Sequence, residues 1–157
     1  MAELIEKYKQ ITKNMGVLCN RTNTLVVQTE KGLYLTDPGE TIESGKELID
    51  VLSQLFPGKE VEGIFLTHAH TDHTGALPPV LETFSSTIYA GRTTAALLQV
   101  PEATGYIYSG SKPGKEMGAK EFVMDTAVNT DIILSDGQEI DIGNIIVKTI
   151  ALPGHCP

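Results

Sequence analysis

The sequence contains only two cysteines, Cys19 and Cys156, and they lie near opposite ends of the chain. Two cysteines so far apart do not form the dense disulfide framework of small secreted proteins. No apolar stretch approaches the roughly 20 residues that a membrane-spanning helix needs. The first residues, MAELIEKYKQ, also lack the apolar core of a signal peptide. These absences predict a cytoplasmic protein with free thiols and no association with membranes.

Positive charge is scarce as well. The chain has 12 Lys and Arg against 20 Asp and Glu, a formal net charge of −8, and its basic residues are scattered without a run. Nucleic-acid binding depends on clustered positive charge that neutralises phosphates. We therefore expect no tight binding to DNA or RNA.

The rest of the composition is that of one globular domain. The 157 residues are 41% hydrophobic and 20% charged, with no internal repeat and no linker. A chain of this length buries about two-thirds of the surface that it exposes when unfolded. We expect residues 1–157 to belong to a single domain.

Hydrophobic periodicity predicts alternating strands and helices. The β-rich runs are 23–30 and 32–37, joined as a hairpin at Glu30–Gly32, followed by 61–67, 86–91 and three short strands within 131–152. Turns are expected at 136–137 and 143–144. Helical spacing covers 48–56, about 77–84 and 93–99. Ser44 and Glu47 have the spacing of a capping box at the start of the first of these helices.

Two segments give weaker signals. Residues 101–120 are rich in Gly, Ser and Lys without periodicity, which predicts a long loop. The N-terminus fits a helix through Leu4, Tyr8, Ile11 and Met15, but Lys9, Ile11 and Lys13 also fit an exposed strand.

Three of the four histidines lie in THAHTDH, residues 67–73, directly after the expected strand 61–67. His68 and His70 are two residues apart, so their side chains point the same way on an extended segment. Asp72 and His73 follow in the turn before the next helix. Imidazole nitrogens suit zinc, and a carboxylate suits a second, harder ligand position. The alternative is a chance group of surface histidines. The presence of three of the four histidines within six positions argues against it.

Three segments resemble the metallo-β-lactamase superfamily. THAHTDHTG (67–75) matches its T-H-x-H-x-D-H-x-G motif, and LYLTDPG (33–39) resembles its strand that ends in a buried aspartate. LSDGQEIDIGNIIVKTIALPGHCP (134–157) resembles the segment that leads to its third motif, usually P-G-H-T-P-G. The similarity runs from about Ile11 to the end. It implies an α/β fold of the α+β sandwich type, about the first half of an αββα sandwich.

The resemblance also implies roles for individual residues. His68, His70 and His155 would hold one metal ion, and Asp72 and His73 would belong to a second. Asp37 would orient the loop that carries the ligands. The alternative for Asp37 is an ordinary turn aspartate before Pro-Gly.

The chain departs from the family pattern at its end. The family continues past the third motif with a further half that holds a metal-bridging aspartate and a final histidine, whereas this sequence stops at Pro157. Cys156 replaces the usual threonine, and we expect it to point away from the metal. The resemblance therefore predicts a domain truncated after the third motif. We expect such a chain to be inactive or weak alone, and either to self-associate through an exposed sheet face or to be partly disordered.

The activity implied by the resemblance is hydrolysis. Two zinc ions, with iron or manganese as alternatives, would activate a hydroxide that attacks a small-molecule ester, thioester or lactone. Asp72 would hold the second ion and could steer the nucleophile. Two alternatives stay open: an RNA or DNA phosphodiesterase, since residues 70–98 also resemble the nuclease branch, and a metal-binding fragment without catalysis. A penicillin-degrading role would usually require export, for which no signal peptide is present.

Overall fold

A computed structural model describes residues 5–111 and 126–156. Its centre is a seven-stranded sheet in which the strands follow one another in chain order, β1 to β7. The first four strands pair antiparallel, and β4 to β7 pair parallel. The strands are β1 Tyr8–Thr12, β2 Met15–Leu18, β3 Thr24–Gln28, β4 Leu33–Thr36, β5 Val61–Leu66, β6 Thr87–Gly91 and β7 Ile132–Leu134.

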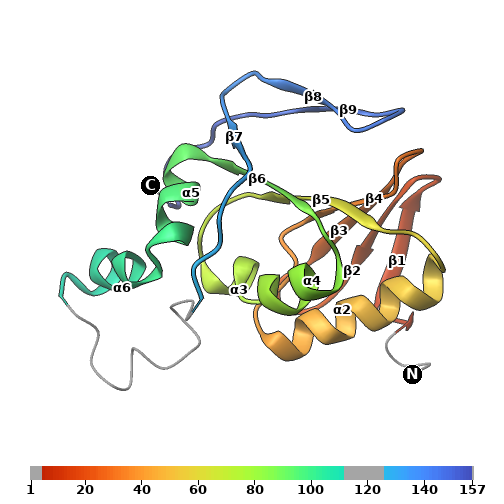
Figure 1. The fold of residues 1–157 in the computed structure, drawn as a ribbon, viewed down its shortest axis with the longest axis horizontal. Coiled ribbons are helices and arrows are strands. Elements are labelled where there is room, and N and C mark those ends of the chain that lie inside the picture. The colour runs from red at the N-terminus through yellow and green to blue at the C-terminus, as the bar shows by residue number, and fades with distance from the viewer. Residues whose placement is uncertain (1–4, 112–125, 157) are drawn as a thin grey trace.

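The two faces of this sheet are covered by different structures (Figure 1). Three helices, α2 Ile42–Leu55, α3 Thr71–Thr74 and α4 Leu77–Thr83, lie on one side. A two-stranded antiparallel sheet, β8 Glu139–Asp141 with β9 Ile146–Lys148, lies on the other. Helices α5 Arg92–Gln99 and α6 Pro101–Ser109 follow β6 at the edge. Within the described ranges, none of the helices combines the length and the apolar character needed to cross a bilayer.

Side-chain alternation along the strands explains both layers. In β4, Leu33 and Leu35 are fully buried toward the helices, where they join Leu48 and Leu52 of α2 in one core. Tyr34 points the other way and packs in a second, smaller core with Tyr89 of β6 and Ile142 of the hairpin β8–β9. The face opposite the helices is therefore partly covered by the hairpin, and the expected self-association through it stays a prediction.

The second core needs a glycine at its centre. A Cβ atom on Gly63 of β5 would lie 2.8 Å from ring carbons of both Tyr34 and Tyr89. Phe65 stacks on Tyr89 with ring centroids 4.4 Å apart. A glycine in a strand interior often marks such a close approach.

Most of the elements predicted from the sequence are confirmed, two predictions are wrong in part, and an alternative left open at the N-terminus is resolved. The first helix begins earlier, with a capping box of Thr41 and Ser44 instead of Ser44 and Glu47. Residues 101–109 form α6 instead of a loop, and residues 112–120 of that expected loop lie outside the described residues. At the N-terminus the strand alternative holds as β1, and β2 was not predicted.

Candidate metal centre

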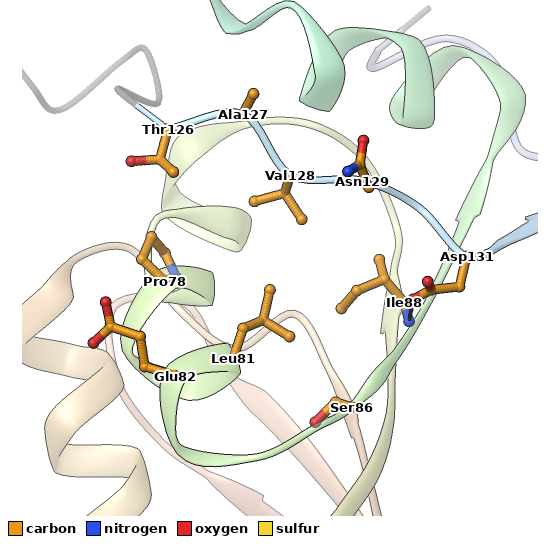
Figure 2. A pocket seen from close by; sticks show the side chains of 10 residues that line it. All are labelled: Pro78, Leu81, Glu82, Ser86, Ile88, Thr126, Ala127, Val128, Asn129 and Asp131. Carbon is orange, nitrogen blue, oxygen red and sulfur yellow. Dashed lines mark hydrogen bonds between the residues drawn. The ribbon is translucent and has the colours of Figure 1, made fainter.

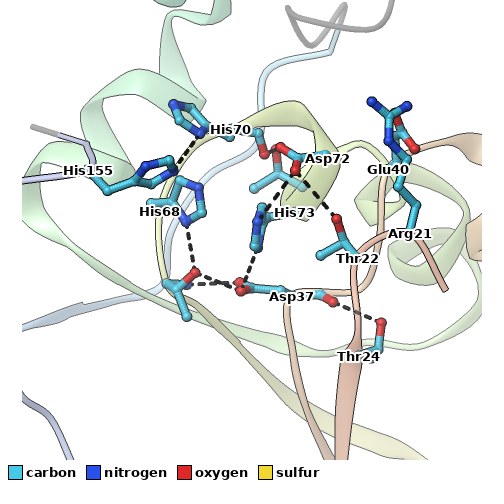
Figure 3. A network of polar contacts seen from close by, with 12 residues as sticks. Arg21, Thr22, Thr24, Asp37, Glu40, His68, His70, Asp72, His73 and His155 are labelled. Carbon is cyan, nitrogen blue, oxygen red and sulfur yellow. Dashed lines mark hydrogen bonds and ion pairs between the residues drawn. The ribbon is translucent and has the colours of Figure 1, made fainter. Parts of the chain in front are cut away.

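The parallel strands place the chemistry at one edge of the sheet. Strands β4, β5 and β6 run the same way, so their carboxyl ends meet where ligands of α/β folds usually bind. Asp37 follows β4, and Thr67 to His70 follow β5. His155, 85 residues further along the chain than His70, reaches the same place (Figure 3).

The rings of His68, His70, His73 and His155, here called the histidine cluster, lie against one another. The ring centroid of His68 is 4.5 Å from that of His70, 4.1 Å from that of His73 and 4.9 Å from that of His155. Four like side chains rarely crowd together unless a common partner is bound. The structure thus brings together all four histidines that the sequence nominated.

Asp37 ties this cluster to the sheet. Its Oδ1 accepts a hydrogen bond from Thr67 N at 2.9 Å, and its Oδ2 accepts one from Thr67 Oγ1 at 2.6 Å. The same Oδ2 lies 2.8 Å from His73 Nδ1. Asp37 is buried with φ 51°, a left-handed conformation in which aspartate is enriched among residues other than glycine. Its geometry is that of a residue that orients others, because its oxygens are already occupied by Thr67 and His73.

The first candidate position consists of His68, His70 and His155, whose ligand nitrogens lie within 4.8 Å of one another. His155 Nε2 is 3.2 Å from His70 Nδ1. Thr67 donates its only hydroxyl hydrogen to Asp37. In the 2.9 Å contact between Thr67 Oγ1 and His68 Nδ1, the donor is therefore His68 Nδ1. The lone pair of His68 is therefore on Nε2, which is buried and has no hydrogen-bond partner among the described residues. A buried nitrogen of this kind fits a metal ion.

Protonation at this position also suits a metal. Burial, assisted by the nearby His73 and His70, lowers the pKa of His68 to about 4. Burial and the adjacent His155 likewise lower the pKa of His70. Both shifts favour the neutral imidazole, which is the form that binds metals.

The second candidate position is formed by Asp72 and His73. The hydrogen bond with Asp37 raises the pKa of His73 and directs its other nitrogen, Nε2, toward Asp72, whose Oδ2 is 3.6 Å away. Asp37, His68 and His73 also form a compact group of donor atoms, but Asp37 is engaged as described above. Asp72 and His73 supply two donors where a stable zinc site uses three or four.

Sequence reasoning missed two residues that shape the site. Thr67 links Asp37 to His68, and its place at the start of THAHTDH was a signal that could have found it. Thr22 donates a hydrogen bond from Oγ1 to Asp72 Oδ2 at 3.4 Å. No sequence signal connected these two, because 50 residues separate them.

Two cavities were candidates for a substrate site. One of about 580 Å³ borders His68 and His155, with apolar walls that include Ile150 and Leu152. Cys156 lines this cavity and belongs to neither group of metal-donor residues found among the described residues. The other, about 410 Å³, lies between α4 and residues 126–131 and is lined by no histidine or cysteine of the described chain (Figure 2). Only the first cavity adjoins the metal-binding chemistry.

Comparison with known proteins identifies the family. The model of the metallo-beta-lactamase superfamily matches residues 18–157. The chain belongs to this superfamily. Among solved structures, BJP-1, a subclass B3 metallo-beta-lactamase of Bradyrhizobium japonicum, is 23% identical with a TM-score of 0.78, over 96% of this chain and 53% of that one. The metallo-beta-lactamase GOB-18 of Elizabethkingia meningoseptica is 26% identical with a TM-score of 0.78, over 95% and 52%. The predicted fold class is thereby confirmed.

Curated relatives of this superfamily member are more varied. An atrochrysone carboxyl ACP thioesterase of Aspergillus fumigatus is 29% identical over 136 residues, 85% of this chain and 24% of that protein. A probable metallo-hydrolase of Bacillus subtilis is 33% identical over 94 residues, 60% of this chain and 39% of that protein. The chain thus spans less than half the length of these relatives and about half of the solved structures.

Proposed function

We propose that this protein is a metal-dependent hydrolase of a small-molecule ester, thioester or lactone, with zinc as its metal. The observation that carries the proposal is the histidine cluster, in which the buried Nε2 of His68 lacks a hydrogen-bond partner among the described residues. Iron and manganese are alternatives, because imidazole and carboxylate ligands accept them as well.

Each residue has a distinct task in this reaction. His68, His70 and His155 hold the first ion, while Asp72 and His73 contribute to a second. When bound, zinc lowers the pKa of water toward neutrality and polarises a carbonyl oxygen. Asp37 fixes the tautomer of His73 through Nδ1, and Thr67 fixes that of His68. The Asp72 carboxylate, partly open to solvent, can accept a proton from the attacking water.

The surroundings favour an acyl substrate. The cavity of about 580 Å³ beside His68 and His155 has apolar walls, which suit the hydrocarbon part of an ester or thioester. Two relatives act on thioesters by their names: the atrochrysone carboxyl ACP thioesterase, and a hydroxyacylglutathione hydrolase of Shewanella pealeana that is 39% identical over 57 residues. These similarities support the thioester within the proposed class.

A panel of thioesters, esters and lactones tests this function. We expect zinc-dependent turnover of at least one class, weak at most in the 157 residues alone, and its loss in His68→Ala. Glu139→Ala, which removes an exposed carboxylate from β8, is the matched control and should keep the activity. Zinc binding without turnover of any member of the panel would favour the non-catalytic alternative.

A phosphodiesterase remains the second candidate because a ribonuclease of Thermus thermophilus is 44% identical over 46 residues. The net charge of −8 opposes tight binding of nucleic acid. RNA binding measured across salt concentrations separates the two. A salt-sensitive dissociation constant below about 1 μM at physiological ionic strength would favour the nuclease.

A further inference from the structure

The loop between β2 and β3, residues 19–23, reaches the edge of the metal centre. It starts after Leu18 of β2 and ends before Thr24 of β3. These two residues are paired across the two strands. Arg21 Nη1 donates to Glu40 Oε1 at 2.6 Å, and Glu40 is mostly buried. Thr24 Oγ1 donates to the carbonyl oxygen of Asp37 at 2.9 Å in a buried hydrogen bond. These two contacts hold the loop and the start of β3 against the turn that carries Asp37.

Thr22 stands at the tip of this loop and contacts Asp72 (Figure 3). Its Oγ1 donates to Asp72 Oδ2 at 3.4 Å. The Asp72 side chain is 44% exposed and lies in the first turn of α3, a helix of four residues. The same carboxylate oxygen lies 3.6 Å from His73 Nε2. Among the residues that the structure describes, Thr22 is therefore the one neutral hydrogen-bond donor to Asp72.

We propose that Thr22 is a positioning residue for the second metal position. This inference rests on the proposed function, and it concerns the second ion alone. The hydroxyl of Thr22 holds Asp72 Oδ2 on the side of His73 Nε2, so that the two donors face one ion together. A carboxylate oxygen has two lone pairs, so Oδ2 can accept from Thr22 and still bind a metal.

The physical reason is the freedom of an exposed carboxylate. Without Thr22, no hydrogen bond from the described residues would hold the Asp72 carboxylate, which would keep its 3.6 Å contact with the partly buried His73 Nε2. Ordering the Asp72 side chain costs conformational entropy. If the Thr22 hydroxyl already orders this side chain in the metal-free protein, less of that entropy is lost when the metal binds. Partners that orient ligands typically change metal affinity by about 10- to 100-fold.

Stepwise titration of the metal-free protein with Zn²⁺ and with Co²⁺ tests the proposal. Thr22→Val removes the hydroxyl at nearly constant shape, and Thr22→Ser retains it. Thr87→Val is the matched control, because Thr87 is a partly buried threonine at the opposite, amino end of β6. The measurements are the dissociation constants of the first and second ion, by calorimetry and cobalt absorption, and the midpoint of urea unfolding.

We expect Thr22→Val to raise the dissociation constant of the second ion by about tenfold or more. The first dissociation constant and the urea midpoint should match those of Thr87→Val, and Thr22→Ser should restore the second ion. An unchanged second ion in Thr22→Val would overturn the inference. Equal losses at both positions, or a loss explained by a lower urea midpoint, would show a merely structural role and overturn it too.

The same titration separates this inference from the proposed function. A wild-type chain that binds one ion and never a second would refute the role of Thr22 and leave the first position intact. Failure of the first ion to bind would refute the proposed function itself, and the inference with it.

Discussion

Asp37 and His73 are joined by a contact of 2.8 Å between Oδ2 and Nδ1, although they are 36 residues apart in the sequence. Through the same carboxylate, Asp37 also accepts two hydrogen bonds from Thr67, the residue before the first histidine. One buried side chain thus fixes the end of β5 and the start of α3 relative to each other. The arrangement of the histidine cluster depends on Asp37 without requiring it to touch a metal.

Replacing this carboxylate is expected to weaken both the fold and the metal site. Asp37→Asn keeps the shape and tolerates the positive φ, but one of its two carboxylate oxygens becomes an NH2 donor, so it cannot accept all three bonds from Thr67 N, Thr67 Oγ1 and His73 Nδ1. A buried donor left unpaired costs about 1–3 kcal/mol in the free energy of unfolding. Metal affinity should fall by about 10- to 100-fold. Urea unfolding of the metal-free protein and metal titration measure the two effects.

Asp131→Asn is the control for this change. Asp131 Oδ2 accepts a hydrogen bond from Ile88 N at 2.8 Å at the amino end of β6, far along the strand from the histidines. Its replacement should affect stability without affecting metal affinity. If Asp37→Asn bound metal as tightly as the wild type, the orienting role of Asp37 would be wrong.

Metal content should depend on the two histidines that leave β5. We expect the double substitution His68→Ala and His70→Ala to abolish binding at the first position, because it leaves His155 as the only donor there. Elemental analysis of the purified proteins gives the stoichiometry. Glu139→Ala again serves as the control, and an unchanged zinc or iron content in the double variant would show that the metal binds elsewhere.

The sequence was most informative where a short range of residues determined the outcome. His68 and His70 follow the end of one strand two residues apart, and His73 is three residues further on. The closeness of their rings could therefore be predicted from a short segment of sequence. The strands of the sheet were readable because both of its faces are partly buried, which leaves strong β-rich runs. The contact between Thr22 and Asp72 was not readable, because it depends on how a loop folds over another element.

Two local errors had identifiable causes. Thr41–Ser44 and Ser44–Glu47 are both spaced by three residues, so the spacing alone could not distinguish them, and Thr41 is the residue that caps α2. For α6, Pro101 at its first turn and Gly110 with φ 66° after its last residue are ordinary helix boundaries. The Gly, Ser and Lys content of the wider segment outweighed these two signals.

Gly75, the last residue of the motif THAHTDHTG, is expected to be intolerant of any side chain. A Cβ atom there would lie 1.8 Å from the backbone oxygen of Glu40, which cannot move aside as a side chain can. We expect Gly75→Ala to lower the free energy of unfolding by about 3 kcal/mol, at the upper end of ordinary overpacking. It should also disturb the Arg21–Glu40 pair that anchors the loop bearing Thr22.

Gly91→Ala is a suitable comparison for Gly75→Ala. Gly91 has a negative φ and nothing within 4 Å of its added Cβ, so only its place as the helix cap of α5 is affected. That change should cost less than about 1 kcal/mol. Urea unfolding of both variants provides the test, and equal effects would contradict the steric explanation.

Asp72 is expected to matter for rate and little for folding. Its side chain is partly exposed and belongs to no core, so Asp72→Asn should shift the melting temperature by only a few degrees. In a form of the protein that turns over substrate, kcat should fall by about two orders of magnitude or more, since the amide can neither accept a proton nor neutralise a metal. Glu43→Gln, which alters an acid in the first turn of α2, should leave kcat unchanged. Near-normal turnover in Asp72→Asn would remove it from the mechanism.

Self-association is expected on the side of the hairpin β8–β9. The apolar side chains that follow or belong to β9 are widely exposed: 59% for Ile146, 70% for Ile150 and 84% for Leu152. Several large apolar side chains in one segment favour association, and a two-stranded sheet also leaves unpaired backbone edges. Sedimentation velocity over a range of concentrations should show oligomers that dissociate on dilution. The double variant Ile150→Asp and Leu152→Asp should stay monomeric. Ile11→Asp, which places the same charge at a 60% exposed position on β1, should associate like the wild type. A wild-type chain that is monomeric at every concentration would refute this prediction.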